Sequence, residues 1–159
     1  MAYSHIAHDC LLGDYCIFSN NSTLAGHVTV GDHVTLAGMV AVHQFCKIGR
    51  HCFIAGGSLV RKDIPPYVKA AREPLSFVGI NSVGLRRRGF DTNTIKSIQN
   101  IYRILFQKKH NNTQAISIIE AELEATKERD EILSFIQNSQ RGIMTVSYTH
   151  LRAHETVGN

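Results

Sequence analysis

The sequence contains no tryptophan, only three prolines, and no stretch near the roughly 18 consecutive apolar residues of a membrane-spanning helix. Charged residues make up only 19% of the chain, and a net charge of +4 is too small to indicate a nucleic-acid-binding protein. Hydrophobic residues make up 43% of the 159 residues, which excludes a disordered or fibrous protein and suffices for a domain with a core. Residues 1–5 have neither the basic head nor the apolar stretch of a signal peptide, so we expect a cytoplasmic location.

A six-residue repeat runs from Ile6 to Pro65. The first residue of every hexad is apolar: Ile6, Leu12, Phe18, Leu24, Val30, Leu36, Val42, Ile48, Ile54 and Val60. The second residue is small in most hexads, and the fifth is always small or β-branched. Hexads of this kind are typical of a parallel β-helix, in which three hexads form one coil of eighteen residues. Residues eighteen apart are then neighbours in a column, about 4.8 Å apart.

The four cysteines all occupy the inward fifth position of a hexad. Cys10 and Cys46 are two coils apart, as are Cys16 and Cys52, and about 10 Å is too far for a disulfide. We interpret the cysteines as small core residues rather than as a metal or redox site.

After the repeat, the sequence predicts a loop and helices in place of the β-helix. Asp63-Ile64-Pro65-Pro66 is expected to end the prism, because proline cannot donate to the ladder, and a loop is expected over 67–90. Helical spacing of apolar residues then predicts three helices, the first from Asp91 or Thr92 to Leu105, the others near 113–127 and 129–139. The predicted organisation is a β-helix over 1–66, the loop, and a helical domain over 91–144.

Three histidines fall in hexads that are eighteen residues apart. His8, His27 and His43 should therefore lie on one face of the prism, with Asp9 in the column of His27 and beside His8. General base catalysis needs an imidazole that a carboxylate orients, and His8 with Asp9 satisfies this requirement. Gly26, in the column of His8, leaves open space and offers an N–H that could hold an oxyanion.

Two other interpretations of these histidines stay open. Exposed histidines can simply decorate a polar face, which is what we expect of His33 and His51. A zinc site would need three or four ligands around one ion, and the spread of the histidines over three coils disfavours it. We therefore predict no metal and no bound cofactor.

Four stretches carry a resemblance to a known family: His5–Cys10, Leu24–Val28, Ala41–Cys46 and Gly79–Phe90. Together they resemble the bacterial UDP-N-acetylglucosamine acyltransferases, and the resemblance extends from about residue 1 to Met144. It implies a left-handed parallel β-helix with a small C-terminal helical domain and a homotrimer with active sites between neighbouring prisms. It also implies transfer of an (R)-3-hydroxyacyl chain from acyl carrier protein, which carries it on phosphopantetheine, to the 3-hydroxyl of UDP-N-acetylglucosamine, opening lipid A biosynthesis.

The resemblance also assigns roles to residues. His8 matches the general base, Asp9 its supporting carboxylate, and Gly26 the N–H that faces the oxyanion. The positions that match substrate contacts are His5, His27, His43 and Gln44, with Asn81, Arg87 and Arg88 on the nucleotide sugar. Gly56, with Phe53 nearby, matches the position that limits acyl-chain length. Arginine suits a diphosphate, although Arg86–Arg88 could by itself be a solvated cluster.

The chain departs from the family in three places. The family's chain has about six more coils ahead of the position of Met1, and it has an acidic residue where this chain has Val83. Without those coils we expect strand edges and apolar residues of the first coil to be exposed, with aggregation and weak turnover as consequences. Residues 145–159, including His150 and His154, match nothing in the family and are predicted to be a non-native tail.

Two further functions remain alternatives. Another hexapeptide-repeat enzyme, such as a sugar N-acetyltransferase that uses coenzyme A, would usually carry a catalytic histidine on an external loop, which this chain lacks. An inactive β-helix scaffold is the other alternative: further hexads in the reading frame ahead of Met1 would favour the acyltransferase, and a stop codon there would favour the scaffold.

Overall fold

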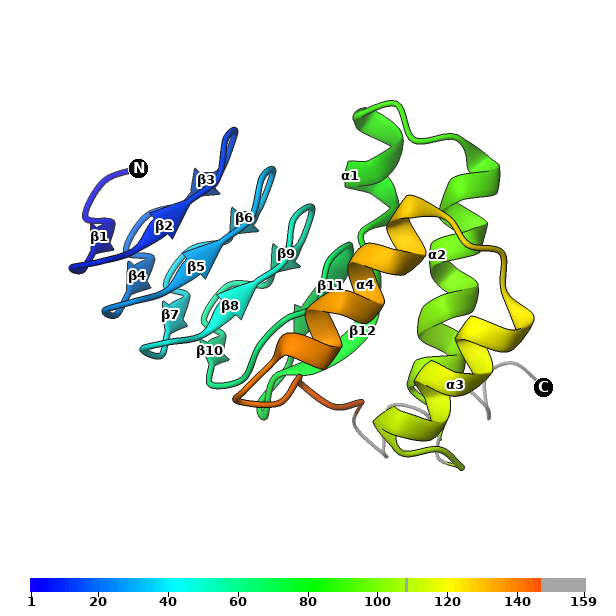
Figure 1. The fold of residues 1–159 in the computed structure, drawn as a ribbon. Coiled ribbons are helices and arrows are strands. Elements are labelled where there is room, and N and C mark those ends of the chain that lie inside the picture. Colours follow the sequence, from blue (N-terminus) through cyan, green and yellow to red (C-terminus); the bar gives the residue numbers. More distant parts are fainter. Residues whose placement is uncertain (108, 147–159) are drawn as a thin grey trace.

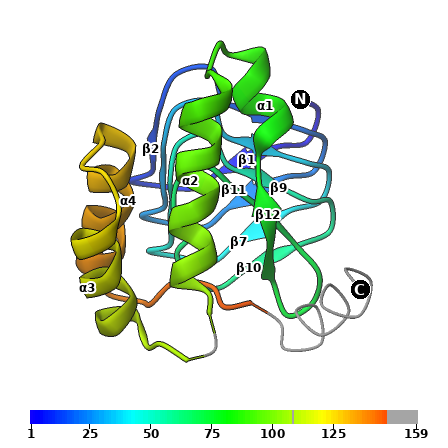
Figure 2. The ribbon, with the colours of Figure 1, turned by 90° about the vertical axis from the view of Figure 1, so that its right-hand side faces the viewer.

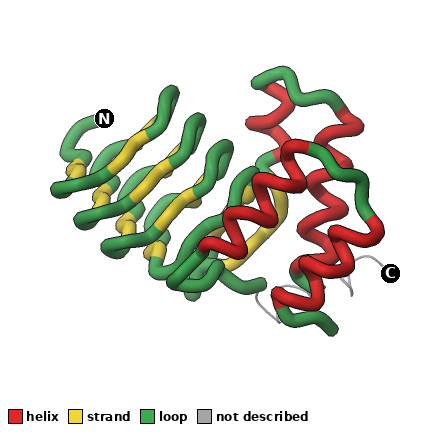
Figure 3. The backbone as a smooth tube through the Cα atoms, viewed as in Figure 1, coloured by secondary structure: helices red, strands yellow, loops and turns green. Residues whose placement is uncertain are grey.

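The structure is a computed structural model that describes residues 1–107 and 109–146. Its first part is a parallel β-helix whose coils stack along one axis, and helices lie at the C-terminal end of that stack (Figure 1). Most strands are only two residues long and are joined by tight turns, so the path of the chain is a series of similar loops (Figure 3). The predicted fold class, a parallel β-helix followed by a small helical domain, is confirmed.

Three sheets form the faces of the prism. The first face holds β1 (His5–Ile6), β4 (Thr23–Leu24), β7 (Ala41–Val42) and β10 (Leu59–Val60). The second holds β2 (Leu11–Leu12), β5 (Thr29–Val30) and β8 (Lys47–Ile48). The third begins with β3 (Ile17–Phe18), β6 (Thr35–Leu36) and β9 (Phe53–Ile54). Partners such as Ile6 and Leu24 are eighteen residues apart, which is the coil length that the hexads predict.

The hexad pattern has a direct structural cause. Its first and fifth residues point into the prism, and from Leu24 onward they are buried. The fourth residue of each hexad lies at a corner of the prism. In every hexad from Asp9 to Gly57, the residue at this position has a positive φ, between 58° and 73°. This left-handed conformation costs most residues about 1–2 kcal/mol, and only Gly57 among these nine is glycine. Ladder bonds and stacking of equivalent side chains must offset that cost.

Three columns of turns result from this repetition. We call them corner 1 (8–9, 26–27 and 44–45), corner 2 (14–15, 32–33, 50–51 and 66–67) and corner 3 (20–21, 38–39 and 56–57). Corner 1 separates the first face from the second, corner 2 the second from the third, and corner 3 the third from the first.

The β-helix continues beyond the prolines that were expected to end it. Ile64 forms a parallel bridge with Ile48, and β11 (Val68–Ala71) pairs in parallel with β9. Pro65 and Pro66 are tolerated because the flanking residues, Ile64 and Tyr67, donate the ladder bonds of this coil. The loop expected over 67–90 is therefore wrong in part: β12 (Ser76–Ile80) returns antiparallel to β11, and α1 (Ser82–Arg87) follows.

The three predicted helices are present; the first has the expected bounds, and the other two have shifted ends. They are α2 (Thr92–Leu105), α3 (Asn112–Glu122) and α4 (Lys127–Asn138), and Figure 2 shows α2 across the end of the prism. Asp91 caps α2 by accepting from the Thr94 N–H at 2.7 Å, as expected. The α3 helix ends before residue 127 because Leu123 is extended and Thr126 caps α4. None of these described helices combines the length and apolarity needed to cross a bilayer.

The four cysteines are unbridged, as predicted. Cys46 and Cys52 are fully buried in the core, where burial raises the pKa of their thiols to about 11 and about 12. Cys10 and Cys16 are half-buried in the first coil, where the inward residues Ile6 and Leu12 keep 45% and 42% of their surface exposed. The predicted tail falls outside the described residues from 147 onward, and its first residue, Thr145, bridges to Ser76.

The small second residue of the hexad should be essential where the next coil passes closely. A Cβ added to Gly31 would lie 2.6 Å from the backbone nitrogen of Arg50, so Gly31→Ala should lower the free energy of unfolding by about 1–3 kcal/mol. Gly38→Ala is the control, because its Cβ would meet only the carbonyl oxygen of Asn20, at 3.6 Å. Denaturant unfolding of both variants measures the difference, and equal stabilities would contradict this account.

Candidate active site

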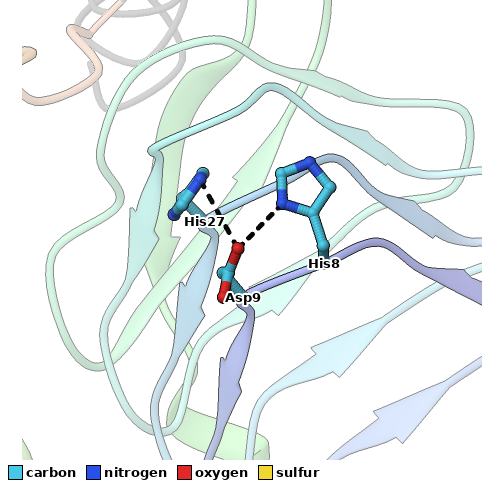
Figure 4. Close-up of side chains that lie close together, drawn as sticks. All are labelled: His8, Asp9 and His27. Carbon is cyan, nitrogen blue, oxygen red and sulfur yellow. Dashed lines mark hydrogen bonds and ion pairs between the residues drawn. The ribbon is translucent and has the colours of Figure 1, made fainter.

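His8 and Asp9 form a hydrogen-bonded pair at corner 1. Nδ1 of His8 lies 3.0 Å from Oδ2 of Asp9, and Nε2 of His27, one coil further on, lies 3.8 Å from the same oxygen (Figure 4). Because the carboxylate can only accept, the pair places the proton of His8 on Nδ1 and leaves Nε2 as the acceptor. The side chains of His8 and Asp9 are 71% and 66% exposed, so solvent or a ligand can reach them.

Gly26 makes room for the His8 ring. A Cβ at residue 26 would lie 2.7 Å from Cε1 and 2.8 Å from Nε2 of His8, closer than any side chain could approach. The ring edge of His8 that carries Cε1 and the accepting Nε2 is therefore directly against the Gly26 backbone. The Gly26 N–H has no acceptor among residues 1–107 and 109–146. The structure thus brings together the three residues predicted to be catalytic.

Stacking along corner 1 holds the second imidazole. The His27 ring stacks on Phe45 with centroids 4.8 Å apart and planes 8° apart, and it meets His8 edge-on at 5.1 Å. The backbone fixes these rings, because His27 N–H donates to the His8 carbonyl and Phe45 N–H to the Gly26 carbonyl. Sequence reasoning missed Phe45, although it shares its hexad position with His27 and Asp9.

The charge of Asp9 is stabilised by its neighbours. The hydrogen bond from His8 lowers the pKa of the Asp9 carboxyl below its usual value of 3.8, and the nearby His27 lowers it further. Asp9 is therefore ionised at neutral pH. Ligand atoms of His8, Asp9 and His27 all lie within 4.8 Å of one another, so this exposed cluster also has the ligand types of a zinc site, but a fourth described His, Cys, Asp or Glu does not join it.

The other predicted residues on this side lie around the cluster. His43 follows β7 and Gln44 opens the corner 1 turn above Gly26; both are exposed, and Nδ1 of His43 lies 3.2 Å from the Gln44 carbonyl oxygen. His5 is exposed on β1, paired with Thr23. The first face and corner 1 thus carry most of the predicted substrate contacts.

The proposed chain-length residues lie elsewhere in the protomer. Gly56 belongs to corner 3, where its missing side chain faces the Gly38 carbonyl oxygen: a Cβ would be 3.2 Å from it. Phe53 lies on β9 of the third face, with the Lys69 ammonium 5.9 Å from its ring centroid. Within one protomer, these residues and His8 are at different corners.

The predicted nucleotide-sugar residues gather at corner 2. Asn81 precedes α1 and donates through Nδ2 to the His51 carbonyl at 3.0 Å, while Nη1 of Arg88 lies 3.1 Å from Nδ1 of His51. Arg87 is exposed beside them. His51 was expected to be an exposed surface residue, and this expectation is wrong: its residue exposure is 4%, because α1 and Phe90 cover the corner.

Comparisons with known proteins give a consistent result. A family model described as UDP N-acetylglucosamine O-acyltransferase, domain 2, matches residues 63–144. A protein of Thiobacillus denitrificans named acyl-(acyl-carrier-protein)–UDP-N-acetylglucosamine O-acyltransferase is 42% identical over 144 residues, which are 91% of this chain and 56% of the relative. A Stenotrophomonas maltophilia protein of the same name is 42% identical over 151 residues, with coverage of 91% and 55%.

Solved structures agree with these relatives. The UDP-N-acetylglucosamine acyltransferase of Francisella novicida is 38% identical with a TM-score of 0.88, covering 94% of this chain and 55% of that one. The enzyme of Bacteroides fragilis is 44% identical with a TM-score of 0.84, covering 86% and 53%. The chain therefore spans about half the length of the relatives that it matches.

The contacts in the cluster predict which of two histidine substitutions changes the pKa of the Asp9 carboxyl more. His8→Ala should raise the pKa of Asp9 toward 3.8, because it removes the hydrogen bond that lowers it most. His27→Ala is the matched comparison and should raise that pKa less, since His27 acts only through its charge. A carbon-detected NMR titration of the Asp9 carboxyl measures both shifts, and a larger effect of His27→Ala would show that the His8–Asp9 hydrogen bond is wrongly assigned.

Proposed function

The chain belongs to the UDP-N-acetylglucosamine O-acyltransferase family, and we propose that it transfers an (R)-3-hydroxyacyl chain from acyl carrier protein to the 3-hydroxyl of UDP-N-acetylglucosamine. This reaction would be the first step of lipid A biosynthesis. The observation that carries the proposal is the contact between the Nε2 edge of the His8 ring and the Gly26 backbone. It puts the proposed base next to a residue whose N–H has no acceptor among the described residues, and acyl transfer to a hydroxyl requires a base and a donor to the oxyanion.

In the proposed reaction, Nε2 of His8 takes the proton of the sugar 3-hydroxyl while that oxygen attacks the thioester carbonyl. The negative charge that develops on the carbonyl oxygen is stabilised by the Gly26 N–H. Collapse of the intermediate breaks the carbon–sulfur bond, and the proton on His8 passes to the departing phosphopantetheine thiolate. Asp9 accepts from Nδ1 at 3.0 Å and stabilises the imidazolium that forms in between.

The acceptor would be bound by groups from more than one corner. His5, His27, His43 and Gln44 surround the base and would contact the sugar and the acyl donor. Asn81, Arg87 and Arg88 would hold the nucleotide and its diphosphate, for which arginine has the matching fork of donors. No cofactor takes part, because the acyl carrier protein and its phosphopantetheine are the donor substrate.

A homotrimer is part of the proposal. The residues around His8 lie at corner 1, the arginines at corner 2 and Gly56 at corner 3, so one prism cannot present all of them to a single small substrate. Three parallel prisms about a common axis could place different corners of neighbouring copies around each substrate. We also propose a cytoplasmic location, since the proposed donor, an acyl carrier protein, and the proposed acceptor, a nucleotide sugar, are both intracellular.

Removal of the base should abolish most turnover and leave the fold intact. His8→Ala should lower kcat by about 10²–10⁴, the usual contribution of a positioned base. His110→Ala, a substitution between α2 and α3 and away from corner 1, is the control. The assay follows acyl transfer to UDP-N-acetylglucosamine, both for this chain and for a chimera that places the remaining N-terminal part of the Thiobacillus denitrificans relative ahead of Met1. Near-normal kcat of His8→Ala in an active chimera would exclude His8 as the base.

The acyl-chain length should depend on Gly56. Gly56→Met should shift the preference toward donors several carbons shorter, because each methylene that loses its buried place forfeits about 0.8 kcal/mol. Gly38→Met is the matched control, since Gly38 lies at the same corner one coil earlier. Competition between donors of different length in the same chimera measures the profile, and an unchanged profile for Gly56→Met would remove Gly56 from this role.

A further inference from the structure

A column of four stacked rings runs along corner 2. Tyr15, His33, His51 and Tyr67 follow one another with centroids 4.9, 4.9 and 5.7 Å apart and planes within 15° of parallel. All four have positive φ, so the backbone repeats with the rings. The column is thus a regular stack whose members differ mainly in what lies beside them.

His51 differs from His33 in being enclosed. Phe90 meets its ring edge-on at 5.0 Å, and the residue is 4% exposed, whereas His33 is half-buried. Burial, followed by the charge of Arg88, lowers the pKa of His51 to about 4. The ring is therefore neutral at physiological pH, and its Nδ1 can accept the hydrogen bond from the Arg88 guanidinium at 3.1 Å.

Several contacts around α1 converge on the same residue. Asn81 donates its side-chain amide to the His51 carbonyl instead of capping α1. Gly84 permits this arrangement, because a Cβ there would lie 2.6 Å from Nδ2 of Asn81 and 3.0 Å from Nη1 of Arg88. His51 therefore anchors both ends of the segment from Asn81 to Arg88, one through its backbone and one through its ring.

Arg88 is the only arginine among residues 1–107 and 109–146 whose side chain bonds to an imidazole. The side chains of Arg50, Arg61 and Arg129 bond to carboxylates, on Glu131, Glu73 and Asp130. Arg88 has no carboxylate partner among residues 1–107 and 109–146 and is held by a neutral ring. A carboxylate would fix the guanidinium and cancel its charge, whereas an imidazole fixes it and leaves both the charge and the other donors for an anionic ligand.

We propose that His51 is a positioning residue that fixes Arg88, with Asn81, in the orientation that binds the diphosphate of a nucleotide sugar. The inference rests on the proposed function, which supplies the ligand. His51 does not touch the ligand and acts through Arg88. Stacking between His33 and Tyr67 and the edge contact with Phe90 set the position of the His51 ring, and the ring sets where the guanidinium lies.

The test is the affinity of this chain for UDP-N-acetylglucosamine, measured by titration calorimetry. His51→Phe keeps the stacked ring and removes the acceptor, and His51→Asn removes the ring but keeps an acceptor near Nδ1. Both residue types already occupy this hexad position, at Phe45 with φ 66° and at Asn21 with φ 62°. His33→Phe is the matched control, because it makes the same change one coil away, where no arginine is bound.

We expect His51→Phe to weaken the affinity by about tenfold or more, the usual consequence of losing a hydrogen bond to a charged group. His51→Asn should recover part of that loss, and His33→Phe should leave the affinity unchanged. In an Arg88→Ala background, His51→Phe should have no additional effect, because the two residues act as one unit.

The outcomes separate the inference from the proposed function. Binding that is lost in Arg88→Ala but kept in His51→Phe would overturn the inference alone. Equal losses in His51→Phe and His33→Phe, or a full additional loss in the Arg88→Ala background, would show that the ring column matters only for stability. Binding that is unaffected by Arg88→Ala, or absent from the wild-type chain, would contradict the nucleotide site and the inference with it.

Discussion

The structure depends on one constraint: each coil must return to the same place after eighteen residues. That requirement puts equivalent hexad positions directly above one another, so any property of one position is repeated along a column. The inward first and fifth residues form the core, and the fourth residues take the left-handed conformation at each corner. Stacking of side chains and ladder bonds between coils offset the energetic cost of that conformation, and these interactions form only when every coil adopts it.

The hexad frame explains why so much could be predicted from the sequence. The coil length, the inward residues and the neighbourhood of His8, Asp9, Gly26 and His27 all follow from counting in eighteens. The end of the prism could not be predicted in this way. Pro65 and Pro66 looked like terminators by residue type, but whether a proline interrupts a ladder depends on whether its missing N–H was needed there.

The burial of His51 could not be predicted from the sequence either. The hexads show that Tyr15, His33 and His51 share one column, so their stacking was available from counting alone. The surroundings of the column could not be predicted by counting, because α1 and Phe90, which cover it, lie more than thirty residues later in the chain. The expectation that His33 and His51 are exposed does not hold: His33 is half-buried within the column, and His51 is covered where the helical part returns over the prism.

The two columns show how one backbone position can serve opposite electrostatic purposes. At corner 1 the stack of Phe45 and His27 ends at Asp9, whose exposed carboxylate is bonded to the His8 imidazole. At corner 2 the stack is covered, so His51 stays neutral and serves as an acceptor for a cation. Solvent access, rather than residue type, thus separates the two columns: corner 1 exposes a carboxylate bonded to an imidazole, and corner 2 buries an imidazole bonded to a guanidinium.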